Sequence, residues 1–281
     1  MDDLILQFAE YLRSSERVLF ITGAGISADS GLPTYRGAGG LYNDELTTEG
    51  YRIEQCLSAT MFARRPEITW KYMLPIAEAV FKCKPNNAHY FIAELETQFN
   101  NNGGKVVILT QNIDGYHKQA GSKNVLEIHG TLKKLFCTNN NCNWTEYLEP
   151  NKPQNQLQEN INTKISERIE QIKSKLPPRC PVCNSVIRPA IVLFEESLPY
   201  EVLAKFDGEF DNGAGFDLVV SIGTSAMFPY ITAPIYEAIR QNKKTVDINP
   251  TKSNLSELVN IHIPTTAANT FKKLKIILSK K

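Results

Sequence analysis

Residues 17–40 read RVLFITGAGISADSGLPTYRGAGG and carry the strongest indication of fold in the chain. The stretch opens with the apolar run 18–21, which is long enough for one buried strand. A glycine turn follows, and Gly23, Gly25 and Ala28 have the G-x-G-x-x-A spacing of a dinucleotide-binding turn. In such a turn, backbone N–H groups and the dipole of the next helix face a pyrophosphate. The stretch therefore predicts a Rossmann-like nucleotide-binding domain.

The segment after this turn excludes an ordinary dehydrogenase. A dehydrogenase continues through a helix to a second strand, with an acidic residue about 20 positions on that holds the ribose. Here residues 31–40 form a glycine-rich loop, and no strand pattern appears before residue 50. A long loop attached to a nucleotide turn is more often a functional cover than a connector.

The remaining apolar runs indicate an α/β fold. Helices are predicted over residues 4–12 and 55–100, and buried strands by the runs at residues 18–21, 105–110, 125–128, 191–193, 218–222 and 245–248. Strands that alternate with helices imply a mostly parallel sheet, with ligands outside the carboxyl ends of the strands. Polar or glycine-containing blocks follow these strands at Gly23, Gln111, His129, Gly223 and Asn249. We expect the Rossmann-like domain to comprise residues 1–132 and 188–281.

The composition limits the partners and the location. The 281 residues are 42% hydrophobic, enough for a large core, and 31 basic against 30 acidic residues give a net charge of +1. We therefore expect no direct binding to nucleic acid. No run approaches the length of a membrane span, and the N-terminus carries acids where a signal peptide needs bases. We expect a cytoplasmic monomer with reduced cysteines.

Four cysteines predict a zinc site in the intervening segment, residues 133–187. Cys137-x4-Cys142 and Cys180-x2-Cys183 form two pairs able to close a tetrahedral thiolate site. Two disulfides or four ordinary buried thiols are the alternative. A closed four-thiolate site leaves no position for water, which indicates a structural metal.

A helical insertion lies between the two cysteine pairs. Its apolar residues step by four, four, three and four, as on one narrow face of a charged helix: Ile161, Ile165, Ile169, Ile172 and Leu176. The sequence does not indicate the role of this insertion.

Seven ordered blocks resemble the sirtuins, the NAD-dependent protein-lysine deacylases. The resemblance covers roughly residues 10 to 270. The blocks are GAGISADSGLPTYRG, then QNID at 111–114, HG at 129–130, the two cysteine pairs, RPAIVLF at 188–194, GTS at 223–225 and IN at 248–249. The resemblance implies a Rossmann-like domain with an inserted zinc ribbon, NAD as cosubstrate and structural Zn²⁺.

The resemblance also implies roles for individual residues. His129 would be the general base and Asn112 a second catalytic residue. Gln111 and Asn112 would lie at the nicotinamide-side ribose, and Asp114 would bind the nicotinamide amide. Residues implied to contact NAD are Gly23, Ala24, Gly25, Ser27, Tyr35, Arg36, Gln111, Asn112, Ile113, Asp114, Gly223, Thr224, Ser225 and Asn249. Residues implied to contact an acyl-lysine protein or peptide are Met73, Ile76, Val192, Phe194 and Glu195.

Each of these assignments has a plainer alternative. A single histidine at a strand end is often structural, although an imidazole that titrates near neutrality suits a general base. Asn112 and Asp114 are also good caps for a helix that begins near Gly115. Arg36 can be a solvated loop charge, although a diphosphate offers it a bidentate partner.

Three positions depart from the family pattern. Tyr35 stands where many members have phenylalanine, and Glu195 replaces a glycine beside the peptide-binding strand. Met73 and Ile76 occupy the positions where a desuccinylase branch has tyrosine and arginine. Without that arginine we expect a preference for neutral acyl groups.

The resemblance implies acyl transfer to NAD with release of nicotinamide, giving free lysine and acyl-ADP-ribose. NAD glycohydrolase or protein ADP-ribosyltransferase activity on the same fold is the alternative enzyme class. A non-enzymatic module that binds protein or nucleic acid is the other alternative, which the near-zero charge and the complete set of NAD blocks disfavour.

Overall fold

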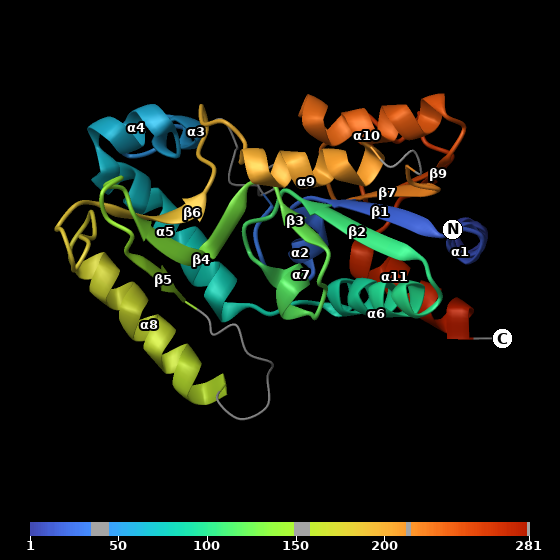
Figure 1. Ribbon diagram of the computed structural model, residues 1–281, viewed down its shortest axis with the longest axis horizontal. Coiled ribbons are helices and arrows are strands. Elements are labelled where there is room, and N and C mark those ends of the chain that lie inside the picture. Colours follow the sequence, from blue (N-terminus) through green and yellow to red (C-terminus); the bar gives the residue numbers. More distant parts are fainter. Residues whose placement is uncertain (35–44, 149–157, 212–214, 280–281) are drawn as a thin grey trace.

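The computed structural model describes residues 1–34, 45–148, 158–211 and 215–279, and contains a large parallel sheet beside a smaller antiparallel one (Figure 1). Tyr35 and Arg36, which the resemblance assigns to NAD, lie outside the described residues. Among the described helices, none combines the length and apolar character that a membrane span requires.

The large sheet has six strands in the order β3-β2-β1-β7-β8-β9, all parallel. Their bounds are β1 Arg17–Thr22, β2 Lys105–Thr110, β3 Val125–Glu127, β7 Leu218–Ile222, β8 Lys244–Ile248 and β9 Ile261–Ile263. Five of these strands match the predicted runs, which confirms the Rossmann-like sheet. The short edge strand β9 was not predicted.

Helices cover both faces of this sheet. Successive residues of a strand point to opposite faces, and because these strands are apolar throughout, both faces must be buried. In β1, Val18 and Phe20 join one core with α1 (Asp2–Arg13), α6 (Asn87–Asn101) and α11 (Ala267–Ser279). Leu19 and Ile21 join a second core with α9 (Tyr200–Asp211) and α10 (Pro229–Arg240). Figure 1 shows the two helical layers above and below the strands.

The described residues between β1 and β2 contain five helices, and four of them lie within residues 53–101, close to the predicted helical range 55–100. The five helices are α2 (Gly25–Ala28), α3 (Ile53–Cys56), α4 (Ala59–Arg64), α5 (Pro66–Lys82) and α6. Pro66 occupies the first turn of α5, where its missing N–H costs nothing. Asn86 caps α6 by accepting from the Ala88 N–H at 2.9 Å.

The predicted return of residues 191–193 to the large sheet is wrong. Ile191 ends β6 (Ile187–Ile191), which pairs antiparallel with β4 (Gly130–Cys137) in a sheet completed by β5 (Thr145–Tyr147). A short apolar run does not specify its partner strand, so either sheet was compatible with it. The small sheet extends beyond the predicted bounds of the inserted segment, residues 133–187, because β4 starts before residue 133 and β6 ends after residue 187. The division of the chain into two domains stays a prediction.

The predicted helix of the insertion is α8 (Gln158–Ser174), which lies against α5. Its residues Ile165, Ile169 and Ile172 are buried in one cluster with Trp70 of α5. This confirms the apolar face for those three residues. Leu176 packs against the cluster from beyond the end of the helix, and the side chain of Ile161 is outside the described part of the chain.

Candidate active site

The candidate site lies where the sheet order reverses, between β1 and β7. From this point the chain adds β2 and β3 on one side and β8 and β9 on the other. Such a switch point leaves a crevice outside the carboxyl ends of the strands, where ligands bind in open α/β sheets.

The turns after β1 and β7 touch at this crevice. The Gly25 N–H donates to the Gly223 carbonyl at 2.9 Å. A Cβ on Gly25 would lie 2.6 Å from the Gly223 Cα, and one on Gly223 would lie 2.5 Å from the Gly25 Cα. Gly223 also has φ +57°, a conformation that side chains disfavour. Only glycine therefore fits at both positions.

A cleft of about 840 Å³ opens at these turns. Most of the described residues predicted for NAD or substrate line it: Gly23, Ala24, Gly25, Met73, Ile76, Gln111, Asn112, Ile113, His129, Val192, Phe194, Glu195, Gly223, Thr224, Ser225 and Asn249. The structure thus brings together residues from across the chain, while their individual roles stay predictions.

A smaller cavity of about 30 Å³ holds the two other predicted residues, Ser27 and Asp114. The Ser27 hydroxyl donates to Asp114 at 2.7 Å, and the Asn112 amide donates to the Ser27 oxygen at 3.2 Å. Asp114 also accepts from the Tyr116 N–H, the first N–H of α7 (Tyr116–Gln119), at 2.9 Å, although the N-cap position itself is Gly115. Burial raises the pKa of Asp114. Together these side chains carry a carboxylate that can accept hydrogen bonds from the amide of a small planar ligand, and hydroxyl and amide groups that can donate to it.

A second polar group links the loops after β2, β7 and β8. Gln111 donates to the Thr224 hydroxyl at 2.9 Å, and the Asn249 amide donates to the Thr224 carbonyl at 3.0 Å. Ser225 is exposed beside them. Short hydroxyls and amides on three adjacent loops can hydrogen-bond the ribose and phosphate oxygens of a dinucleotide.

His129 stands two residues after β3, at the cleft wall. Its Nδ1 is 2.9 Å from the Gln111 carbonyl oxygen, and its Nε2 is 2.8 Å from the Tyr230 hydroxyl. Because a carbonyl only accepts, Nδ1 carries the proton and Nε2 is the basic atom. Burial lowers the pKa of His129, and the Gln111 hydrogen bond partly opposes this effect. The imidazole is thus neutral near neutral pH, as a general base must be.

The segment 192–196 forms one rim of the cleft. The Val192 N–H donates to the His129 carbonyl at 2.9 Å, and Phe194 exchanges backbone hydrogen bonds with Leu57 and Ala59 at 3.0 and 2.9 Å. Glu195 has φ +72°, which costs a non-glycine residue about 1–2 kcal/mol. Its carboxylate accepts from the Thr60 N–H in α4 at 3.1 Å. Glu195 therefore keeps a backbone conformation suited to glycine and adds a carboxylate to the rim.

The helix α5 lines the cleft through Met73 and Ile76, and Met73 is almost fully buried. The charged residues of the described lining are Glu195, Glu196 and Lys252. Lys252, which lies three residues after Asn249, forms an ion pair with Glu257 at 2.9 Å. The described lining beside Met73 thus offers no arginine to an acidic ligand.

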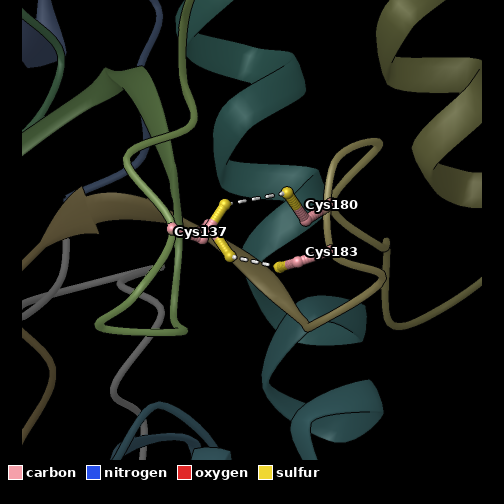
Figure 2. Close-up of side chains that lie close together, drawn as sticks. Cys137, Cys180 and Cys183 are labelled. Atoms are coloured by element: carbon pink, nitrogen blue, oxygen red, sulfur yellow. Dashed lines mark hydrogen bonds between the residues drawn. The ribbon is translucent and has the colours of Figure 1, made fainter.

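The four predicted zinc ligands converge at one end of the small sheet. Their Sγ atoms all lie within 4.8 Å of one another, and Figure 2 shows Cys137, Cys180 and Cys183 with sulfurs turned inward. The closest approaches are 3.4 Å for Cys137–Cys183 and 3.7 Å for Cys142–Cys180. A disulfide needs about 2.05 Å, whereas zinc–sulfur bonds of about 2.3 Å in a tetrahedron separate the sulfurs by about 3.8 Å. All four are free thiols, so the disulfide alternative is wrong and the geometry fits a zinc ion.

Sequence reasoning missed Tyr230 and Phe228, which contact His129 at the cleft. Both lie near the start of α10, where their pattern is that of an ordinary amphipathic helix. No local signal marks a contact between residues 101 positions apart.

The fold and cleft define a class of protein, a Rossmann-like dinucleotide-binding protein with a partly buried histidine in the cleft and a four-thiolate site in a small second sheet. The Sir2 family model matches residues 23–229. The NAD-dependent protein deacylase 2 of Pseudomonas aeruginosa is 40% identical over 259 residues, covering 92% of this chain and 90% of that protein. The chain therefore belongs to the Sir2 family.

Solved structures agree with this assignment. A structure described in terms of the mechanism and regulation of Sir2 enzymes matches with a TM-score of 0.78 and 31% identity, covering 100% of this chain and 99% of that one. A complex of a Sir2 homologue with NAD matches with a TM-score of 0.74 and 29% identity, covering 97% and 93%.

Two buried histidines behind the cleft make stability depend on pH. His117 bonds Thr22 at 3.0 Å and stacks edge-on with His89, and burial lowers the pKa of His117 to about 3. The unfolded chain, with a histidine pKa near 6.5, binds this proton first as pH falls. The free energy of unfolding should therefore fall below about pH 6.5 and level off near pH 3, losing about 2 kcal/mol for His117 by pH 5.

The measurement is urea unfolding of the wild type and His117→Gln at pH 7.5 and 5.0. The variant lacks the titrating ring, so its free energy of unfolding should fall by about 2 kcal/mol less between pH 7.5 and 5.0 than that of the wild type. An equal loss in both proteins would contradict the assignment to His117.

Proposed function

We propose that this chain is an NAD-dependent protein-lysine deacylase that transfers a neutral acyl group from lysine to ADP-ribose and releases nicotinamide. The observation that carries this proposal is the neutral, partly buried His129, which opens into the same cleft as the loops after β1, β2, β7 and β8. Family membership supports the same activity. NAD is consumed, and is therefore a substrate.

In this proposal the paired turns at Gly25 and Gly223 hold the diphosphate, and Thr224 and Asn249 hold the adenosine side. Ser27, Asn112 and Asp114 bind the nicotinamide amide in the small cavity. Arg36 and Tyr35 belong to the same proposal on the basis of the resemblance alone. The acyl-lysine enters between the rim at 192–196 and Met73 and Ile76 of α5.

His129 acts after nicotinamide has left. It takes the proton of a ribose hydroxyl, and that oxygen attacks the acyl carbon now joined to the ribose. The cleft holds the reacting groups at close range, which removes much of the entropic barrier. A glycohydrolase or an ADP-ribosyltransferase needs no such base for a ribose hydroxyl, so a neutral His129 in the cleft favours deacylation.

We also propose one structural Zn²⁺ held by the four cysteines. The ion would tie β4 to the turn before β6 and so fix the rim that follows β6. With four thiolates it has no open position, and no chemical step passes through it. A domain division at residues 133 and 187, a monomeric state and a cytoplasmic location belong to the proposal as predictions from the sequence.

Replacing the base should separate binding from transfer. His129→Ala should lower deacylation about 100- to 10,000-fold, the usual contribution of one general base. NAD binding should persist, because the diphosphate and nicotinamide contacts lie on other residues. The assay is turnover of an acetyl-lysine peptide at saturating NAD, with NAD affinity by calorimetry. His262→Ala, which lies outside the cleft lining, should retain turnover. A variant with more than a tenth of wild-type turnover would refute the role.

Removing one thiolate should release the metal. Freshly purified, reduced protein should contain one zinc per chain, and Cys180→Ser should lose it with a large fall in melting temperature, because binding energy in such sites is also folding energy. Cys83→Ser is the matched control, since Cys83 is a free cysteine outside the cluster. Elemental analysis checks both proteins. Wild-type protein without zinc would reject the site.

The acyl pocket should discriminate by charge. A succinyl carboxylate beside Met73 and Ile76 would lose water without gaining a cation, and it would approach the carboxylates of Glu195 and Glu196. An unpaired buried charge costs several kcal/mol, and each 1.4 kcal/mol or so is tenfold in rate. We expect acetyl and butyryl peptides to exceed the succinyl peptide by at least about 100-fold in kcat/KM. Equal turnover of the succinyl peptide would show that a cation reaches the pocket from outside the described lining.

A further inference from the structure

The basic nitrogen of His129 already has a partner in the cleft. Nδ1 donates to the Gln111 carbonyl at 2.9 Å, which leaves the lone pair on Nε2. The Tyr230 hydroxyl lies 2.8 Å from that nitrogen and donates to it. An imidazole nitrogen has one lone pair, so a second hydroxyl cannot bond Nε2 while Tyr230 does.

Tyr230 is held in this position by its ring. It stacks on Phe228 with ring centroids 5.3 Å apart and planes 12° apart, and it contacts the His129 ring edge-on at 5.9 Å. Phe228 contacts His129 edge-on at 6.3 Å. Aromatic pairs of this kind add about 0.5–1.5 kcal/mol each beyond their burial. Swinging Tyr230 away would break the stack and the hydrogen bond together.

The Tyr230 hydroxyl keeps capacity for a second hydrogen bond. Tyr230 is only partly buried and lines the cleft together with His129. A phenol oxygen that donates one hydrogen bond can still accept another. A ribose hydroxyl in the cleft can therefore donate to the Tyr230 oxygen while Tyr230 donates to His129.

We propose that Tyr230 is a catalytic residue that relays the proton from the ribose hydroxyl to His129. The ribose O–H bond breaks as its proton passes to the Tyr230 oxygen, and the Tyr230 proton passes to His129 Nε2. The electron pair stays on the ribose oxygen, which attacks the acyl carbon. Tyr230 ends as a phenol and His129 as an imidazolium, so the step needs no further reactant.

One further property of the site fits this relay. Burial raises the pKa of Tyr230 to about 12, so a free phenolate is disfavoured and both protons must move together. The proposal rests on the proposed deacylase function, because it concerns only the step in which the ribose oxygen attacks. It adds a residue that the family resemblance did not assign.

The test compares Tyr230→Phe with Tyr236→Phe, a matched change on the exposed side of the same helix. Phenylalanine keeps the stacking ring and removes only the hydroxyl. Two assays are run on each protein with one acetyl-lysine peptide: deacylation, and exchange of labelled nicotinamide into NAD. Exchange reports the step before the ribose oxygen attacks, so it also shows that the variant is folded and binds both substrates.

Tyr230→Phe should lower the kcat of deacylation on the order of 100-fold, at the lower end of the effect of a positioned proton-transfer group. It should leave nicotinamide exchange near the wild-type rate, and Tyr236→Phe should change neither. Deacylation by Tyr230→Phe at or above the wild-type rate would overturn the relay and show that the hydroxyl only caps the base and is displaced. A parallel loss of both activities, or a change confined to KM, would also overturn it in favour of a structural role. A wild-type protein that deacylates nothing would refute the proposed function itself, which is a separate result.

Discussion

The close approach of the turns after β1 and β7 is the constraint on which the cleft depends. The two backbones meet at Gly25 and Gly223 with no room for a Cβ on either side, and one hydrogen bond joins them. This contact is possible because β1 and β7 are neighbours whose carboxyl ends are level, as the Thr22–Ile222 register shows. It sets the distance between the loops that carry the predicted dinucleotide contacts, and so the width of the cleft. A side chain at either glycine would part the loops and remove the surface that a diphosphate needs.

Around this contact the polar groups of the site are already paired with one another. Asn112, Ser27 and Asp114 form one chain of hydrogen bonds, and Gln111, Thr224 and Asn249 form another. Groups held by such bonds need little reordering when a ligand arrives, which lowers the entropic cost of binding. Because of these bonds, Asp114 can hold the first N–H of α7 and still have its predicted role in ligand binding. One carboxylate oxygen accepts from the Tyr116 N–H, and the other accepts from Ser27 at the cavity.

The small sheet connects the cysteine cluster to the rim of the cleft. β6 leaves the cluster, pairs with β4, and continues directly into residues 192–196. Arg188 in β6 is almost buried and forms a bidentate pair with Glu196, at 2.6 and 2.9 Å, which ties that rim back to the strand. A metal at the cysteines would therefore influence substrate binding through the position of the rim, although it stands outside the cleft. The α8 insertion packs on α5, which also lines the cleft through Met73 and Ile76.

The sequence by itself determined the parts of this protein that depend on local pattern. Short continuous apolar runs predicted five of the six parallel strands, glycine spacing predicted the nucleotide turn, and the cysteine spacing predicted a cluster that the fold assembles. Only the tertiary structure decided which elements meet. Of the run at 191–193, only Ile191 belongs to a strand, and that strand joined the small sheet because strand pairing depends on the partner. The strand β9 was too short to carry a pattern. The contact between His129 and Tyr230 joins the segment after β3 to the start of α10. Residues so distant in the chain carry no shared local signal, and only the folded backbone brings their atoms within hydrogen-bonding distance.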